Sequence, residues 1–297
     1  MCPNKELAAD AKGIMKFDLY RKIIDEIKDF ANDIYLHHRG EPLINPRLCE
    51  MIAYAGERGL KTRFHTNGTL LNPDKGEKLL EASPTLVSFS VDGFDKESYE
   101  NIRVGAEFEK TVENITAFAK ARKTAGLRKP YLVVEKIRFR NPPPSEKPEQ
   151  VLALKQRFLD SGVDEVIEKD EYVWAEENAP ELETKQTYSV CTFPWYAMVI
   201  CADGTVTPCP QDFGAEMRMG NVNTATLREI WHGKPYADLR RKFAEDIQSL
   251  PLCRKCDRLA RKTAGGIPLQ YAATFLIDQL VGYGRLRKTL GTMERRS

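Results

Sequence analysis

Long apolar runs are absent from this chain of 297 residues, in which no stretch of about 18 apolar residues occurs. We therefore expect no membrane-spanning helix. An excess of charge is also lacking, because 45 Lys and Arg residues are balanced by 43 Asp and Glu residues. That balance provides no overall field that would attract nucleic acid or a membrane surface. Internal repeats and a secretory leader are not found either, so we expect a cytoplasmic globular protein.

Cysteine is present at seven positions, and five of them fall between residues 191 and 256. In a chain of this size without a leader, such a concentration favours metal ligation over disulfides. Cys191 and Cys209 form one pair, and Cys253 and Cys256 form a CxxC pair. Two thiolate pairs suit a tetrahedral zinc ion and an iron–sulfur cluster equally well, so the spacing alone leaves both open.

The first 170 residues alternate between two hydrophobic periods. Period-2 runs predict strands at 33–37, 60–66, 85–91, 131–139 and 164–169. Helical spacing predicts helices at 17–31, 46–58, 73–82, 95–124 with a break near Gly105, and 147–162. This alternation indicates βα units and a parallel α/β sheet, which either a doubly wound fold or a barrel could contain.

The cysteine-rich segment contains several further sequence marks. They are C-x2-PW from Cys191, DG-x-V-x-PC ending at Cys209, GNV at 220–222, L-x-EIW at 227–231 and the closing CxxC. The segment resembles the SPASM/twitch auxiliary domain that follows the barrel in many radical S-adenosylmethionine (SAM) enzymes. The resemblance implies a [4Fe-4S] cluster held by Cys191, Cys209, Cys253 and Cys256.

The same resemblance extends to the N-terminal half. It implies a partial (β/α)6 barrel over residues 1–170, a linker at 171–187, the auxiliary domain at 188–262, and a helical, basic tail at 263–297. Cys2, in Met1-Cys2-Pro3-Asn4, resembles the third cysteine of the C-x3-C-x2-C motif that holds the SAM-binding cluster. The first two cysteines and the first barrel strand would precede Met1, and we expect the natural start to lie upstream.

Four short motifs lie at predicted strand ends, where the reactive groups of a parallel barrel gather. The resemblance assigns SAM binding to these residues: Gly40, Glu41, Pro42, Thr66, Asn67, Ser90, Asp92 and Arg103. An acidic side chain such as Glu41 suits the amino group of SAM, and the guanidinium fork of Arg103 suits its carboxylate. A plain turn at the first motifs and a solvated helix charge at Arg103 are the alternative interpretations.

The activity implied by the resemblance is reductive cleavage of SAM followed by abstraction of a hydrogen atom from a substrate. An auxiliary cluster with four protein ligands has no open site and could accept an electron, which favours net oxidation of a small molecule over peptide modification. The implied partners are that substrate and an electron donor such as flavodoxin or ferredoxin. The competing hypothesis is a non-catalytic remnant with structural zinc at the four cysteines.

Several ionisable residues receive no role from the motifs. Side chains alternate along a strand, so one of His37 and His38, and one of Glu135 and Lys136, should face the barrel interior. The sequence does not distinguish the members of either pair. We assign no catalytic acid or base, and we do not count Cys49 or Cys201 among the ligands.

Overall fold

The computed structural model describes residues 3–7, 9, 12–139, 146–171, 174, 191–256, 259, 263–264 and 267–268. Its N-terminal part contains a five-stranded sheet in which every neighbouring pair is parallel. The strands, in spatial and chain order, are β1 (Asp33–Tyr35), β2 (Lys61–Thr66), β3 (Leu86–Ser90), β4 (Tyr131–Arg138) and β5 (Glu165–Asp170). The predicted parallel sheet and its five strand positions are confirmed.

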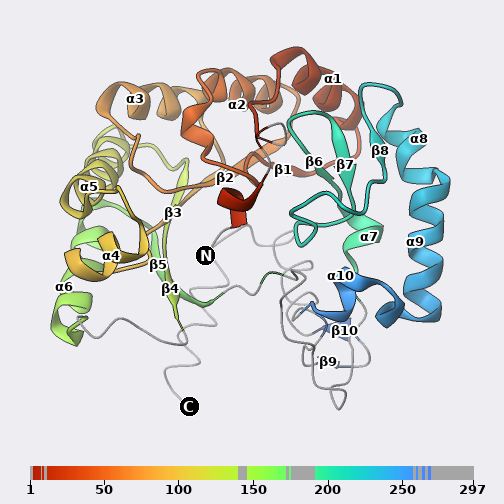
Figure 1. The fold of residues 1–297 in the computed structure, drawn as a ribbon. Coiled ribbons are helices and arrows are strands. Elements are labelled where there is room, and N and C mark those ends of the chain that lie inside the picture. Colours follow the sequence, from red (N-terminus) through yellow and green to blue (C-terminus); the bar gives the residue numbers. More distant parts are fainter. Residues whose placement is uncertain are drawn as a thin grey trace.

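Helices alternate with these strands, as predicted. After a short 3-10 turn, η1 (Pro3–Glu6), come α1 (Phe17–Ile27), η3 (Pro42–Ile44), α2 (Leu48–Glu57), α3 (Pro73–Ala82), α4 (Lys96–Ile102), α5 (Phe108–Thr124) and α6 (Pro148–Ser161). The predicted break in the long helical region is real, because Gly105 has a φ of +86° and separates α4 from α5. Figure 1 shows α2, α3, α5 and α6 on the outer side of the sheet.

The core of this part lies between the sheet and its helices. Phe64 of β2, Phe89 of β3 and Val134 of β4 are fully buried against aromatic side chains of α5 and α6, namely Phe118 and Phe158. Burying each large apolar side chain contributes roughly 1.5–3 kcal/mol. Because strand residues alternate between the two faces, the residues next to these in sequence lie on the opposite, interior face of the sheet.

The cysteine-rich part begins with α7 (Phe193–Tyr196) and an antiparallel sheet of β6 (Val199–Ile200), β7 (Thr205–Thr207) and β8 (Gly220–Asn221). It continues with α8 (Leu227–His232), α9 (Lys234–Glu245), η4 (Ile247–Ser249) and α10 (Pro251–Arg254). Thr226 caps α8 through a reciprocal pair of hydrogen bonds with Glu229. Figure 1 places α8 and α9 at the end of the molecule opposite to α5 and α6.

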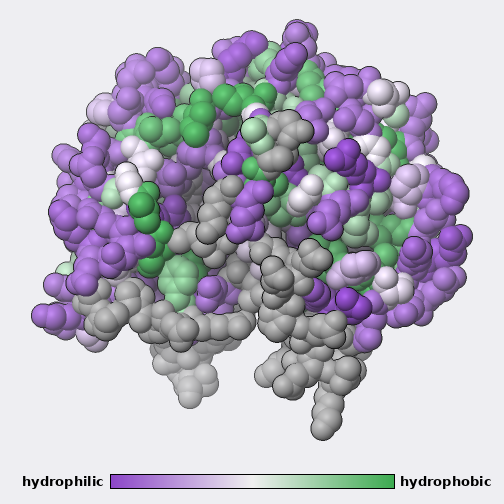
Figure 2. Space-filling model, viewed as in Figure 1, coloured by the Kyte–Doolittle hydropathy of each residue, from purple (hydrophilic) through white to green (hydrophobic). Residues whose placement is uncertain are grey.

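Most of the predicted linker and tail lie outside the described residues. Of the linker, the structure describes Glu171 and Trp174. Of the tail, it describes β9 (Thr263–Ala264) and β10 (Ile267–Pro268), which pair antiparallel. The helix predicted for the apolar run that starts at Leu269 lies outside the described residues. None of the helices among the described residues is long and apolar enough to cross a bilayer. The outer faces over α5, α6, α8 and α9 are mostly hydrophilic (Figure 2).

Helix α1 joins the two parts, because it buries two different faces. Tyr20 and Ile24 pack against α2, where Met51 and Ala55 are buried. Ile23 packs instead against residues of the cysteine-rich part, such as Val206 of β7 and Leu227 of α8. Polar contacts follow the same division, since Glu26 Oε2 accepts a hydrogen bond from Leu227 N at 2.6 Å and Lys22 donates to the carbonyl of Val222.

Replacing Ile23 by Ala should therefore weaken the attachment of the cysteine-rich part. Truncation of a buried isoleucine costs about 2–5 kcal/mol, and we expect the unfolding midpoint of that part to fall accordingly. Chemical denaturation followed by near-ultraviolet circular dichroism measures the change. Ile14→Ala is the matched control, because this side chain is exposed; equal midpoints for the two variants would contradict the proposed bridging role of α1.

Candidate functional site

The carboxylate of Glu41 connects the loop after β1 to the end of β2. Thr66 Oγ1 donates to Glu41 Oε1 at 2.6 Å, and Asn67 N donates to Oε2 at 2.9 Å. Leu43 N also donates to Oε1, at 3.0 Å, so that Glu41 caps η3. The structure therefore brings together Gly40-Glu41-Pro42 and Thr66-Asn67, which the sequence places in separate loops. These bonds make Glu41 the residue that fixes the mutual position of the two motifs.

The turn after β2 is itself tightly fixed. Asn67 Oδ1 accepts hydrogen bonds from Thr69 N at 2.9 Å and from Thr69 Oγ1 at 2.7 Å. Gly68 has a φ of +73°, and a Cβ there would lie 3.2 Å from Ile115 Cγ1, so a side chain would be strained and crowded. The NG pair is thus a built turn that presents Thr66 and Asn67 at the carboxyl edge of the sheet.

Asp92 and Arg103 form an ion pair at the same edge, with 2.6 Å between Oδ2 and Nη2. Asp92 follows β3, which ends at Ser90, and Arg103 follows α4. Asp92 is only 7% exposed, and burial raises its pKa, against the opposing effect of Arg103. Asp92 Oδ1 and Arg103 Nε are both buried and make no hydrogen bond within the described residues. This pair therefore retains one acceptor and one donor for a further polar group.

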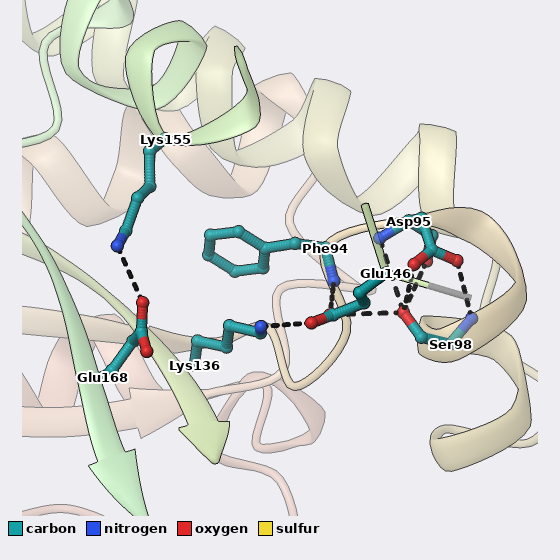
Figure 3. Close-up of polar contacts among 7 residues, drawn as sticks. All are labelled: Phe94, Asp95, Ser98, Lys136, Glu146, Lys155 and Glu168. Carbon is teal, nitrogen blue, oxygen red and sulfur yellow. Dashed lines mark hydrogen bonds and ion pairs between the residues drawn. The ribbon is translucent and has the colours of Figure 1, made fainter. Parts of the chain in front are cut away.

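A network of half-buried polar side chains holds the chain that follows Asp92 (Figure 3). Glu146 Oε1 accepts a hydrogen bond from Phe94 N at 2.7 Å, and its other oxygen pairs with Lys136 of β4. Asp95 and Ser98 cap α4 reciprocally beside it. Sequence reasoning missed Glu146, because no motif marks it and its partner Phe94 lies 52 residues away in the chain.

The strand alternation left open by the sequence is now settled. Lys136 points toward the α6 side of the sheet, where Glu146 and the Lys155–Glu168 pair also lie (Figure 3). Its neighbour Glu135 consequently lies on the interior face. The two histidines after β1 also diverge. The ring of His37 contacts that of His65, with 4.3 Å between centroids and the planes tilted by 37°, whereas the ring of His38 contacts Phe213 at 5.2 Å between centroids.

The loop that follows Cys209 contacts the loop that precedes Gly40. Arg39 donates to the carbonyl of Phe213, and its guanidinium also lies over the Phe213 ring, 5.6 Å from the centroid. Burial lowers the pKa of His38, beside the same ring, to about 4, so this contact is made by a neutral imidazole. The cysteine-rich part thus touches the glycine-containing motif of the barrel directly.

The four predicted ligands Cys191, Cys209, Cys253 and Cys256 gather in the cysteine-rich part. Cys191, Cys253 and Cys256 belong to one apolar cluster with Ile247, Leu252 and Leu259. Burial raises the pKa of Cys209 to about 12, and the other thiols contribute to this rise. Backbone N–H groups of Gln211 and Asp212 face its sulfur, as donors commonly do at iron–sulfur ligands. The chemistry of this donor set fits a four-cysteine cluster.

No group of three His, Cys, Asp or Glu side chains within the described residues has the geometry to hold a single metal ion. Cys2 lies outside the described residues. The two cysteines that we did not count as ligands are buried or half-buried thiols, Cys201 beside β6 and Cys49 on α2.

Known proteins resemble this chain over most of its length. It is 27% identical to the tungsten-containing aldehyde ferredoxin oxidoreductase cofactor-modifying protein of Pyrococcus furiosus, covering 83% of this chain and 80% of that protein. It is 23% identical to the S-adenosyl-L-methionine-dependent 2-deoxy-scyllo-inosamine dehydrogenase of Niallia circulans, covering 88% of each. An AdoMet-dependent heme synthase of Methanosarcina barkeri is 33% identical over 40% of this chain and 35% of its own length.

Solved structures share the fold. The crystal structure of BtrN in complex with AdoMet and 2-DOIA superimposes with a TM-score of 0.54 at 21% identity, covering 86% of this chain and 85% of BtrN. Native anSMEcpe with bound AdoMet superimposes with a TM-score of 0.58 at 14% identity, covering 96% and 93%. At these identities the likeness shows a common fold, and it agrees with the partial barrel expected from the five parallel strands.

Two family models match separate parts of the chain. The radical SAM superfamily model matches residues 1–128, and the SPASM model, described as an iron–sulfur cluster-binding domain, matches residues 191–257. The second match includes all four cysteines. Their spacing alone suits zinc and an iron–sulfur cluster equally, and this match favours the iron–sulfur cluster. Together the two domains imply S-adenosylmethionine and [4Fe-4S] clusters as cofactors. Residues 1–128 of the chain therefore carry a radical SAM domain, and residues 191–257 carry a SPASM domain.

Proposed function

We propose that this protein binds S-adenosylmethionine at the carboxyl edge of β1–β3 and carries out the net oxidation of a small hydroxylated molecule. The observation that carries the binding proposal is the Asp92–Arg103 pair, whose Oδ1 and Nε are buried and have no hydrogen-bond partner among the described residues. The methionine end of S-adenosylmethionine carries a carboxylate, which needs a donor such as Arg103 Nε, and an ammonium, which needs an acceptor such as Asp92 Oδ1. When bound, the cofactors supply hydrogen-atom abstraction from an unactivated carbon.

Each residue of the edge has a distinct task in this proposal. Arg103 binds the methionine carboxylate of SAM, with Ser90 beside it at the end of β3. Glu41 keeps Thr66 and Asn67 in register with the Gly40 loop, so that backbone groups of both loops line the cofactor. Glu146 holds the Asp92 loop from behind. The protein thereby supplies position and excludes water around the reacting atoms.

The proposed outcome rests on the second domain. A cluster with four cysteine ligands has no open coordination position and is suited to electron transfer. The contact of Arg39 with Phe213 joins the loop after Cys209 to the loop that precedes Gly40, which supports a role for the second cluster close to the proposed cofactor site. The dehydrogenase of Niallia circulans, matched along 88% of both chains, further favours oxidation of a small molecule. We expect a reduced flavodoxin or ferredoxin to provide the initiating electron.

Cys253→Ala tests the assignment of the second cluster. The variant should lose about four iron and four sulfide per chain after anaerobic reconstitution, because three thiolates no longer close the site. It should also melt earlier, since metal binding and folding are coupled there. Iron, sulfide and zinc analysis with a thermal melt provides the measurements, and Cys49→Ala is the matched thiol control. Stoichiometric zinc without iron in the parent protein would instead support a structural zinc site and a non-catalytic chain.

Arg103→Ala tests the cofactor site. Loss of a charged, bidentate donor to a carboxylate should raise the Kd for S-adenosylmethionine about tenfold or more in the holoprotein with its first cluster complete. Isothermal titration under anaerobic conditions measures the affinity. Arg241→Ala on α9, where the guanidinium is exposed and pairs with Asp238, is the control. An affinity equal to that of the control would remove Arg103 from the site.

The reaction class is tested with 2-deoxy-scyllo-inosamine as a probe. The reduced holoprotein should release 5′-deoxyadenosine and one equivalent of ketone, both measured by liquid chromatography with mass spectrometry. Release of 5′-deoxyadenosine without any ketone from this probe or from related cyclitols would count against dehydrogenation of this substrate class, while leaving cofactor binding supported.

A further inference from the structure

Three ionisable residues on the interior face of the sheet have no part in the cofactor site described above. Lys136 and Glu168 point to the α6 side, where they pair with Glu146 and Lys155 (Figure 3). Their neighbours Glu135 on β4 and Lys169 on β5 therefore face the interior. His65 on β2 also faces the interior, because Phe64 and Thr66 flank it and Phe64 packs on the helix side.

These side chains contact one another across the sheet. Lys169 Nζ lies 2.7 Å from Glu135 Oε1, and His65 Nδ1 lies 3.5 Å from Glu135 Oε2. His37 adjoins the group, since its ring contacts that of His65 at a tilt of 37° and its Nδ1 accepts a hydrogen bond from His65 N at 3.2 Å. We call His65, Glu135 and Lys169 the interior cluster.

The three side chains of the interior cluster differ in exposure, as is typical of a functional site in which a buried residue supports more accessible ones. Glu135 is 6% exposed, whereas the side chain of His65 is 29% exposed and that of Lys169 is 40% exposed. Burying an ionised carboxylate at the centre of a sheet costs several kcal/mol before pairing, and an apolar residue would serve packing better. The cost is explained if Glu135 supports partners that work in the open interior.

The cluster adjoins the proposed cofactor site. Glu135 lies opposite Ser90 in the β3–β4 register, and its charge contributes to raising the pKa of Asp92, the partner of Arg103. A group presented by His65 would therefore act close to the cofactor-binding edge.

The arrangement fixes the state of His65. A carboxylate facing Nδ1 favours the tautomer with its proton on Nδ1, which leaves the lone pair on Nε2. Burial lowers the pKa of His65, Glu135 opposes that effect and Lys169 adds to it, so the imidazole is neutral near pH 7. The charged and titratable groups facing it from neighbouring strands are Glu135, Lys169 and His37.

We propose that His65 is the proton acceptor for a hydroxyl group of the substrate and that Glu135 and Lys169 position and tune it. This inference rests on the proposed oxidation, which requires the hydroxyl of a carbinol to lose its proton. In the step assigned here, the substrate O–H bond breaks, its electron pair stays on oxygen, and the proton bonds to Nε2 of His65. Once a hydrogen atom has also been removed from the carbon, the carbon radical next to the alkoxide gives up its unpaired electron to the second cluster more readily than the radical of the neutral alcohol does.

The first test does not depend on turnover. The chain has only four histidines, so their labelled ring nitrogens can be assigned by substitution in NMR spectra. His65 should be neutral and protonated at Nδ1 at pH 7.5. Glu135→Gln should move its titration midpoint down by about 1 pH unit and Lys169→Met should move it up, because each removes a charge of opposite sign. Glu168→Gln and Lys155→Met, an ion pair on the helix side, are the matched controls.

The second test separates proton transfer from hydrogen-atom abstraction. With 2-deoxy-scyllo-inosamine deuterated at the carbinol carbon, His65→Gln should still deliver deuterium to 5′-deoxyadenosine but form ketone about 100-fold more slowly. Glu135→Gln should move the pH profile of ketone formation in the direction of its NMR shift, whereas His232→Gln on the exposed end of α8 should behave as the parent.

The outcomes distinguish this inference from the function on which it rests. Failure of the parent protein to oxidise the probe contradicts the proposed substrate class, and the NMR result then decides the state of His65. The proposal is overturned in either case if His65 carries its proton on Nε2, or if Glu135→Gln leaves the titration midpoint of His65 unchanged. Equal losses of deuterium transfer and ketone in His65→Gln would also overturn it, because they would indicate a structural role only.

Discussion

The three hydrogen bonds accepted by the Glu41 carboxylate are the interaction on which the rest of the site depends. Parallel strands place their carboxyl ends at one edge, but they do not fix the loops that leave them. Glu41 does so by accepting from Thr66, Asn67 and its own helical turn. Charge-assisted bonds of this kind are among the stronger ones, and they tie a loop after β1 to a turn after β2. The Asp92–Arg103 pair then extends the same edge to β3.

A second constraint joins the two domains. The short loops around Arg39 and Phe213 touch, and α1 buries one face in each domain. The carboxyl edge of the sheet and the cysteine-rich part are therefore packed together. Interior polar residues such as Glu135, which a purely structural sheet would replace by apolar ones, lie beside this edge.

Much of this arrangement could be predicted from the residues. Hydrophobic periods located all five strands and the helices between them, including the break at Gly105. The cysteine spacing indicated a metal centre, although only the marks between the cysteines favoured iron and sulfide. Local periodicity could not assign Glu135 and Lys136 to a face. Alternation puts these two adjacent charged residues on opposite faces of the sheet, but it does not say which face the helices cover. Nor could it find Glu146, whose partner Phe94 lies far away in sequence.

The double-sided packing of α1 has a consequence for modularity. Auxiliary domains are natural candidates for exchange between related enzymes, because the radical SAM match and the SPASM match occupy separate segments of the chain. Here the receiving surface includes Ile23 and Glu26, which belong to the first helix of the barrel. A transplanted domain would meet a foreign surface unless that face of the helix were grafted with it. The natural unit of recombination is thus discontinuous in sequence, and lineages that swap one segment must adapt the other.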